Sequence, residues 1–332
     1  MACHHLEGSR QFLPVDDPAA GLASGGPSCQ VCSYAWMLYR EGAVVADRIS
    51  AARAMWTMFE PVHAVTYFEP EALGAFTEAG VRGYWRGYFA GRAAPLGGAE
   101  AAVVAASFYN FAPAFVARAI PGVWDLITPQ EAIAVREAGA GAALRRLLGG
   151  REAEAAKAAG LLWRAAEDLD CAGRVLSAAN AELPAAGDPL TRLWQATTLL
   201  REHRGDGHFA ALAAADIDGC EAVVLVCAKD IPRDAMQRNR GWTDEQWDAA
   251  AARLTERGWI GEDGRMTAAG RAAHDAVEAA TDQAAARPWT RMGAVGLAEL
   301  ADAFLPLAQV CAAALPATTG HLPPTRPGPQ PG

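Results

Sequence analysis

Apolar residues recur at helical spacing along most of the chain between about residues 49 and 315. In the stretch WTDEQWDAAAARLTERG, Trp247, Ala250, Ala251 and Leu254 stand at positions i, i+3, i+4 and i+7, which places them on one face of a helix. Thr243 precedes this run and is suited to cap its first turn. Val, Ile and aromatic residues are too thinly spread for a large sheet. The pattern predicts a mainly α protein.

The body of the chain matches itself at a nearly constant offset. Trp194 lies 138 residues after Trp56, and Gly219 lies 136 residues after Gly83. Pro232 follows Pro95, and Gly258 follows Gly122, at closely similar distances. A repeat of this kind indicates an internal duplication.

Each copy ends in a segment that suggests a small hairpin. In the second copy, RGWIGEDGRMTAAG predicts a strand, a tight turn at 262–264, a second strand and a helix capped by Thr267. In the first copy, PGVWDLITPQEA keeps both flanks and shortens the turn before a helix start at Thr128-Pro129. We therefore expect two tandem winged-helix modules with small β wings.

These patterns divide the chain into six parts. They are a flexible N-terminal extension (1–48), a first winged-helix-like module with a reduced wing (49–150), a helical linker (151–190), a second winged-helix module (191–290), a C-terminal helix (291–315) and a disordered tail (316–332). Val295, Leu300, Phe304, Leu307 and Val310 have helical spacing suited to closing an interface between the modules. The modules would then form a pseudo-dimer within one chain.

Several segments resemble known proteins. They are FEPVHAVTYF (59–68), AAPLG (93–97), NFAP (110–113), TLLREHRGDGH (198–208) and the RGW that precedes the predicted wing. Through them the chain resembles MarR-like winged-helix regulators and, more closely, an actinobacterial family of helix-turn-helix proteins with no settled reaction. The resemblance covers roughly residues 53–285. The resemblance implies a winged-helix fold and, as one alternative, the role of a transcription regulator.

Charge argues against DNA as the main partner. The formal net charge is −9, with a pI near 5.3, so nucleic acid would be repelled overall. The helix in the recognition position carries Asp244, Glu245, Asp248 and Glu256, whereas base and phosphate contacts need Arg, Lys, Asn or Gln. The residues available to a DNA-binding alternative are Arg233, Arg238, Arg240 and Arg253.

A dense polar cluster lies between two apolar flanks in the second copy. Its members are Arg201, Glu202, His203, Arg204, Asp206 and His208. Gly205 and Gly207 predict a break or kink in the helix there. Such groups cost desolvation free energy unless they pair with one another or bind a ligand. The first copy offers His63 and Tyr67 at the corresponding place, and Asn110 could line the same cavity.

Three interpretations of this cluster stay open. It could be a structural ion-pair network, or a small-molecule pocket in which Arg201 or Arg204 binds an acidic group. It could also be a metal or haem site built from Glu202, His203, His208 and His63. In the extension, Cys29 and Cys32, with Cys3, His4 and His5 upstream, suggest a zinc site. The sequence identifies no cofactor.

The leading functional hypothesis is a cytoplasmic small-molecule-binding protein, acting as a sensor or as an accessory factor in metabolism. One alternative is a MarR-like DNA-binding transcription regulator, and the other is an enzyme of specialised metabolism that uses the 201–208 cluster. The sequence shows no secretory segment, and its longest apolar stretch, 304–317, is too short to span a bilayer. We expect no membrane partner, and either a monomer or a homodimer.

Overall fold

A computed structural model describes residues 51–229 and 231–316 of the chain. The extension expected over 1–48, with Cys3, Cys29 and Cys32, lies outside these residues. So does the tail expected over 316–332, apart from its first residue.

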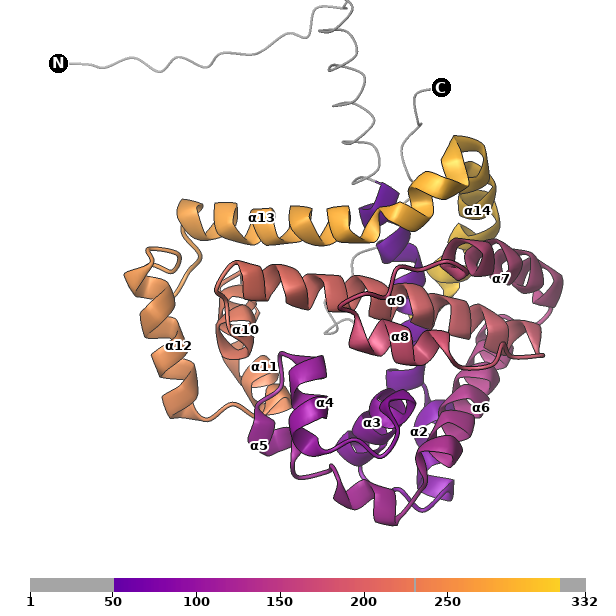
Figure 1. Ribbon diagram of the computed structural model, residues 1–332, viewed down its shortest axis with the longest axis horizontal. Coiled ribbons are helices and arrows are strands. Elements are labelled where there is room, and N and C mark those ends of the chain that lie inside the picture. The colour runs from indigo at the N-terminus through magenta and orange to yellow at the C-terminus, as the bar shows by residue number, and fades with distance from the viewer. Residues whose placement is uncertain (1–50, 230, 317–332) are drawn as a thin grey trace, which may run out of the picture. The chain divides into compact units, whose positions relative to one another are not determined.

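The described residues are mainly helical (Figure 1). A first helix covers 51–68. It is followed by α2 (Pro70–Glu78), α3 (Tyr84–Ala93), the 3-10 helix η2 (Ala94–Leu96), α4 (Ala101–Phe108), α5 (Pro113–Val116), the 3-10 helix η3 (Gly122–Asp125), α6 (Pro129–Leu147), α7 (Glu152–Ala166), α8 (Val175–Ala181), α9 (Pro189–Ala214), α10 (Gly219–Cys227), α11 (Arg233–Arg240), α12 (Asp244–Glu256), α13 (Ala268–Ala285) and α14 (Arg287–Ala314).

The prediction of winged-helix modules with small β wings is wrong, because the described residues contain no β-strand. In the second half the expected wing is reduced to one isolated antiparallel bridge between Ile260 and Met266. Only ten residues separate α12 from the Thr267 cap of α13, and the amide of Met266 is taken by the carbonyl of Ala228 at the end of α10 (3.0 Å). In the first half the expected wing is replaced by η3.

The largest apolar core lies where α9 packs against the helices around it. α9 packs against α6, α7, α8 and α13, and its residue Trp194 is almost completely buried. Figure 1 shows α13 running alongside α9. Separate apolar cores lie under α3–α5 and under α10–α12. The two halves of the chain therefore keep their own apolar centres and share α9 between them.

α9 continues through Gly205 and Gly207, so the predicted break is wrong. At Gly207 the glycine provides space, because a Cβ there would lie 2.5 Å from a guanidinium nitrogen of Arg174 and 3.2 Å from the Cβ of Ala284. The residue thus allows close packing of α13 and Arg174 on a continuous helix.

The C-terminal helix α14 packs mainly against α7. Leu300, Phe304 and Leu307 are buried, whereas Val295 is 85% exposed, close to a kink at Gly293. That these residues close an interface between two modules stays a prediction. By length and apolar composition, α14 alone among the described helices could cross a membrane, and 39% of that apolar stretch is buried inside the protein. One such helix is weak evidence of a membrane span, because core helices of soluble proteins can have the same length and composition.

Helices α11 and α12 are joined by a three-residue turn, Gly241-Trp242-Thr243, which is a connection of the length typical of a helix-turn-helix. Thr243 caps α12 and forms a capping box with Gln246, as its position in the sequence predicts. The turn is held to the first half by two hydrogen bonds. Trp242 Nε1 donates to the carbonyl of Asn110 (3.0 Å), and the amide of Ala112 donates to the carbonyl of Arg240 (2.9 Å).

Gly241 is the point at which this turn touches the first half most closely. Its φ is +75°, and a Cβ there would lie 2.2 Å from the Cβ of Phe115. Gly258 has a similar φ of +69° but open space around it. We expect Gly258→Ala to lower the free energy of unfolding by about 1–2 kcal/mol through backbone strain alone. Gly241→Ala should cost about 1–3 kcal/mol more, because Phe115 must also move.

Urea unfolding followed by circular dichroism measures both variants. Equal losses for the two variants would contradict the close contact of the turn with α5.

Candidate functional site

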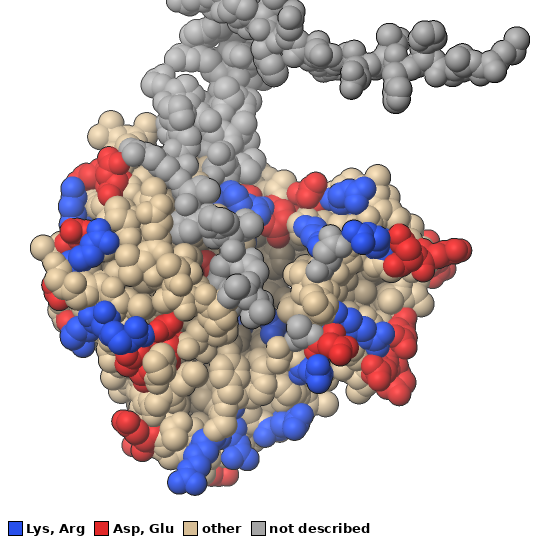
Figure 2. Space-filling view, turned by 180° about the vertical axis from the view of Figure 1, so that it is seen from behind, with Lys and Arg blue, Asp and Glu red and all other residues tan. Residues whose placement is uncertain are grey.

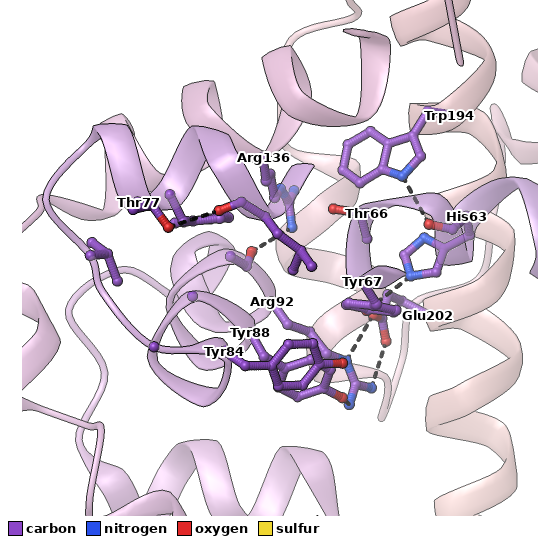
Figure 3. A pocket seen from close by; sticks show the side chains of 16 residues that line it. His63, Thr66, Tyr67, Thr77, Tyr84, Tyr88, Arg92, Arg136, Trp194 and Glu202 are labelled. Atoms are coloured by element: carbon purple, nitrogen blue, oxygen red, sulfur yellow. Dashed lines mark hydrogen bonds and ion pairs between the residues drawn. The ribbon is translucent and has the colours of Figure 1, made fainter. Parts of the chain in front are cut away.

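A cavity of about 160 Å³ lies between the 51–68 helix, α2, α3, α6 and α9 (Figure 3). Most of its wall is apolar or aromatic. The residues that line it are His63, Thr66, Tyr67, Leu73, Phe76, Thr77, Val81, Gly83, Tyr84, Gly87, Tyr88, Gly91, Arg92, Arg136, Trp194 and Glu202. A pocket with mostly apolar walls and a few convergent polar groups is typical of small-molecule sites.

His63 is the central polar group on one wall. Its Nδ1 is 2.9 Å from Thr198 Oγ1, its Nε2 is 3.0 Å from the Tyr67 hydroxyl, and its ring stacks on Trp194. Burial, together with the nearby Arg201, lowers the pKa of His63 well below its ordinary value, so the imidazole is neutral at pH 7. Burial likewise raises the pKa of Tyr67. This wall presents neutral hydrogen-bonding groups.

Glu202 closes another part of the wall, within an ion-pair network. Arg92 donates to both of its carboxylate oxygens, from Nε (3.1 Å) and from a terminal nitrogen (3.0 Å), and Arg201 donates to it at 2.9 Å. Burial opposes ionisation of Glu202, but the two guanidinium groups outweigh burial and hold the pKa of its carboxyl well below the usual range. Glu202 is therefore a buried anion with two cationic partners.

A second opening of about 200 Å³ adjoins the cavity, because Tyr88 and Arg92 line both. We call it the groove. Its walls are Trp56, Glu60, Tyr88, Arg92, Phe108, Asn110, Phe111, Arg201, Arg204, Gly205, His208, Phe209 and Arg240. Four of these are arginines, so the groove is more polar and more cationic than the cavity.

Arg201 and Arg204 on the groove wall are already paired with carboxylates. Arg201 also lies 3.6 Å from Glu60, and Arg204 donates to Asp282 at 2.7 Å. His208 lies beside Thr281, with 3.0 Å between Nδ1 and Oγ1, and burial lowers its pKa to about 4. The groove is thus lined by ion pairs and a neutral imidazole.

The structure divides the nine residues predicted to bind a ligand among three places. His63, Tyr67 and Glu202 line the cavity, whereas Asn110, Arg201, Arg204 and His208 line the groove. His203 and Asp206 line neither of them. One cavity shared by both halves, as the sequence suggested, is therefore replaced by two adjoining ones, and a ligand-binding role for these nine residues stays a prediction.

His203 and Asp206 instead contact neighbouring segments of the chain. Burial lowers the pKa of His203 to about 4 and raises the pKa of Asp206 to about 6. Asp206 accepts a hydrogen bond from the amide of Ser177 (2.9 Å), which ties α8 to α9. The carbonyl of His203 accepts one from Arg174.

Several residues that line the cavity were not predicted from the sequence, above all Arg92, Arg136 and Trp194. Arg136 had a readable signal. It lies four residues after Ala132 and four before Ala140, both of which are buried, and is thus on the inward face of an amphipathic helix. A charged residue at a core position has to pair or to serve a ligand.

A metal or haem site in the 201–208 cluster finds no support. Within residues 51–229 and 231–316, no three His, Cys, Asp or Glu side chains gather as metal ligands. Glu202 faces arginines, and His63 and His208 each face a threonine.

Most arginines suggested for DNA binding are engaged within the protein. Arg233 pairs with Asp244 (2.8 Å) and Asp248 (2.9 Å), and Arg253 pairs with Asp218 and Glu221. Arg240 lies over the ring of Phe111, with its Cζ 4.8 Å from the ring centroid. Arg238 stays largely exposed, 3.6 Å from the equally exposed Asp234. On the face drawn in Figure 2, basic and acidic side chains are interspersed.

The Glu202 network predicts a large and specific cost of neutralisation. Glu202→Gln leaves Arg92 and Arg201 without their shared counter-ion in a buried site, which should lower the free energy of unfolding by about 3–5 kcal/mol. The control Glu154→Gln breaks an exposed pair with Arg151 and should cost about 0.2–1 kcal/mol. Urea unfolding at pH 7 measures both. A loss in Glu202→Gln no larger than in the control would show that the network does not stabilise the fold.

Comparison with known proteins gives one match. The model of a helix-turn-helix family matches residues 52–319, which covers most of the chain. No curated protein and no solved structure matches the chain. The match includes the α11–turn–α12 segment and both openings described above. The chain therefore belongs to this helix-turn-helix family.

Proposed function

We propose that this helix-turn-helix protein binds a small aromatic molecule in the cavity. The observation that carries the proposal is the aromatic cavity itself, which is closed on one side by the Glu202 ion-pair network and holds a neutral histidine. The protein would act as a sensor, in the cytoplasm, with the helix-turn-helix as its output.

Size and chemistry restrict the ligand. The cavity of about 160 Å³ is close to the apolar cavity of about 150 Å³ that holds benzene in another protein. Tyr67, Tyr88 and Trp194 offer ring faces and edges against which a planar ring can pack. The Tyr67 hydroxyl, which is hydrogen-bonded to the neutral His63, supplies a neutral hydrogen-bonding group. A one-ring ligand fits these walls better than a sugar or a nucleotide does.

An internal duplication would explain why two openings adjoin. An offset of 138 residues relates three cavity walls to three groove walls: His63 to Arg201, Thr66 to Arg204 and Tyr67 to Gly205. It relates Trp56 of the groove to Trp194 of the cavity. The same offset relates Glu60 to Thr198 and His63 to Arg201, so the Glu60–Arg201 ion pair corresponds to the His63–Thr198 hydrogen bond. The duplication is proposed on this correspondence of positions. Kinship with MarR-like or actinobacterial proteins is proposed on the segments 59–68, 93–97, 110–113 and 198–208.

DNA binding is the second candidate, and the family match is the observation that favours it. The α11–turn–α12 segment has the connection of a helix-turn-helix, and Arg238 on α11 is exposed. The surface of α12 argues against it, because Asp244, Glu245, Asp248 and Glu256 are all exposed there. A regulator of this kind would have to contact DNA through residues outside α12.

Phenol serves as a neutral one-ring probe of the cavity. Titration should quench tryptophan fluorescence to saturation in the wild type, because Trp194 lines the cavity. Thr66→Phe fills the space and should abolish saturable quenching, whereas the control Ala106→Phe, on the exposed side of α4, should bind phenol as the wild type does. Equal binding by all three proteins would place the probe elsewhere and contradict the proposal.

Fluorescence anisotropy with labelled genomic fragments at low salt tests the second candidate. We expect no nanomolar, salt-sensitive binding by the wild type, since the acidic surface repels phosphate. Nanomolar binding that Arg238→Ala weakens, and that salt weakens further, would establish the DNA-binding function instead.

A further inference from the structure

Arg136 differs from the other buried arginines in having no acidic partner. Three arginines of the described residues are buried, Arg92, Arg136 and Arg204, each 6% exposed. Arg92 pairs with Glu202, and Arg204 pairs with Asp282. Arg136 makes no ion pair in the part of the chain that the structure describes, not even with its neighbour Glu137.

The hydrogen bonds of Arg136 go to neutral acceptors. One terminal nitrogen donates to the carbonyl of Gly91 (3.0 Å) and the other to Oδ1 of Asn180 (2.9 Å). Its Nε is buried and finds no partner among the described residues. A buried guanidinium with a donor left over is costly, because its charge has lost water without gaining an anion.

This guanidinium lines the aromatic cavity. Its Cζ lies 5.4 Å from the centroid of the Trp194 ring, and in Figure 3 it lies apart from the Arg92–Glu202 pair. Among the residues that line the cavity, Arg92 and Arg136 carry two positive charges, against the single carboxylate of Glu202. The local field therefore favours an anion in the cavity.

We infer that Arg136 binds the acidic group of the cavity's ligand, and that this ligand is a one-ring aromatic carboxylate. A carboxylate is planar and accepts charge-assisted hydrogen bonds from a guanidinium, which would supply the partner that Arg136 lacks. The ring would pack against Trp194 and the tyrosines. Arg201 and Arg204, which the sequence suggested for this role, already have carboxylate partners. The inference rests on the proposed function, since it names the class of the same cavity's ligand.

Benzoate and its neutral isostere benzamide test the inference by isothermal titration calorimetry of the full chain at pH 7.5. The wild type should bind benzoate at least about tenfold more tightly than benzamide, as expected for a hydrogen bond to a charged group. Arg136→Met should lose this preference while still binding benzamide, and Arg136→Lys should retain part of it. The control Arg145→Met, on the exposed part of the same helix, should match the wild type.

Thermal melting without ligand separates a binding role from a structural one. Removal of an unpaired buried charge should leave the melting temperature of Arg136→Met at or above that of the wild type. A clearly lower value would mean that Arg136 chiefly holds Gly91 and Asn180 in place, and would overturn the inference.

Binding measurements on the wild type alone also test the anion site. Equal affinity for benzoate and benzamide, or phenol binding without benzoate binding, would overturn the anion site and leave the cavity's function standing. Absence of binding by phenol, benzoate and benzamide together would overturn the proposed function itself.

Discussion

The carboxylate of Glu202 is the group on which the rest of the arrangement depends. It is buried on α9, and its charge is balanced by Arg92 of α3 and Arg201 of α9. One ionic contact thereby joins the first half of the chain to the central helix of the second. Arg92 also belongs to the walls of both openings, so the same contact separates the aromatic cavity from the cationic groove. A buried pair of this kind adds little net stability, but loss of either partner is severe.

The two openings differ in how their arginines are paired. In the groove, carboxylates neutralise Arg201 and Arg204, which thereby hold helices together, and Arg240 lies over the ring of Phe111. In the cavity, Arg136 is held by neutral acceptors and keeps its charge available. The groove also touches the helix-turn-helix, because Asn110 and Arg240 line it and their carbonyls anchor the α11–α12 turn. Tyr88 and Arg92 thus separate a ligand in the cavity from the groove, which contacts the α11–α12 turn.

The sequence predicted helices and caps well, because their signals are local. The Thr243 cap, the inward face of α12 and the buried Leu300, Phe304 and Leu307 follow from spacing alone. The prediction of wings is wrong because a hairpin needs its backbone groups for pairing between its strands. Here the amide of Met266 donates instead to the carbonyl of Ala228 at the end of α10. The predicted kink is wrong because Gly207 provides space for Arg174 and α13, and the helix continues through Gly205 and Gly207. The polar cluster was recognised from its density, but its division into cavity, groove and structural contacts depends on tertiary partners such as Asp282 and Ser177.

The most direct measurement is a crystal structure of the full chain grown with benzoate. We expect difference density for the ring in the cavity beside Trp194 and Tyr88, with the carboxylate within hydrogen-bond distance of Arg136. We also expect the Glu202 contacts with Arg92 and Arg201 to stay in place. Benzoate bound only in the groove or on the surface, with the cavity filled by water, would contradict the proposed site.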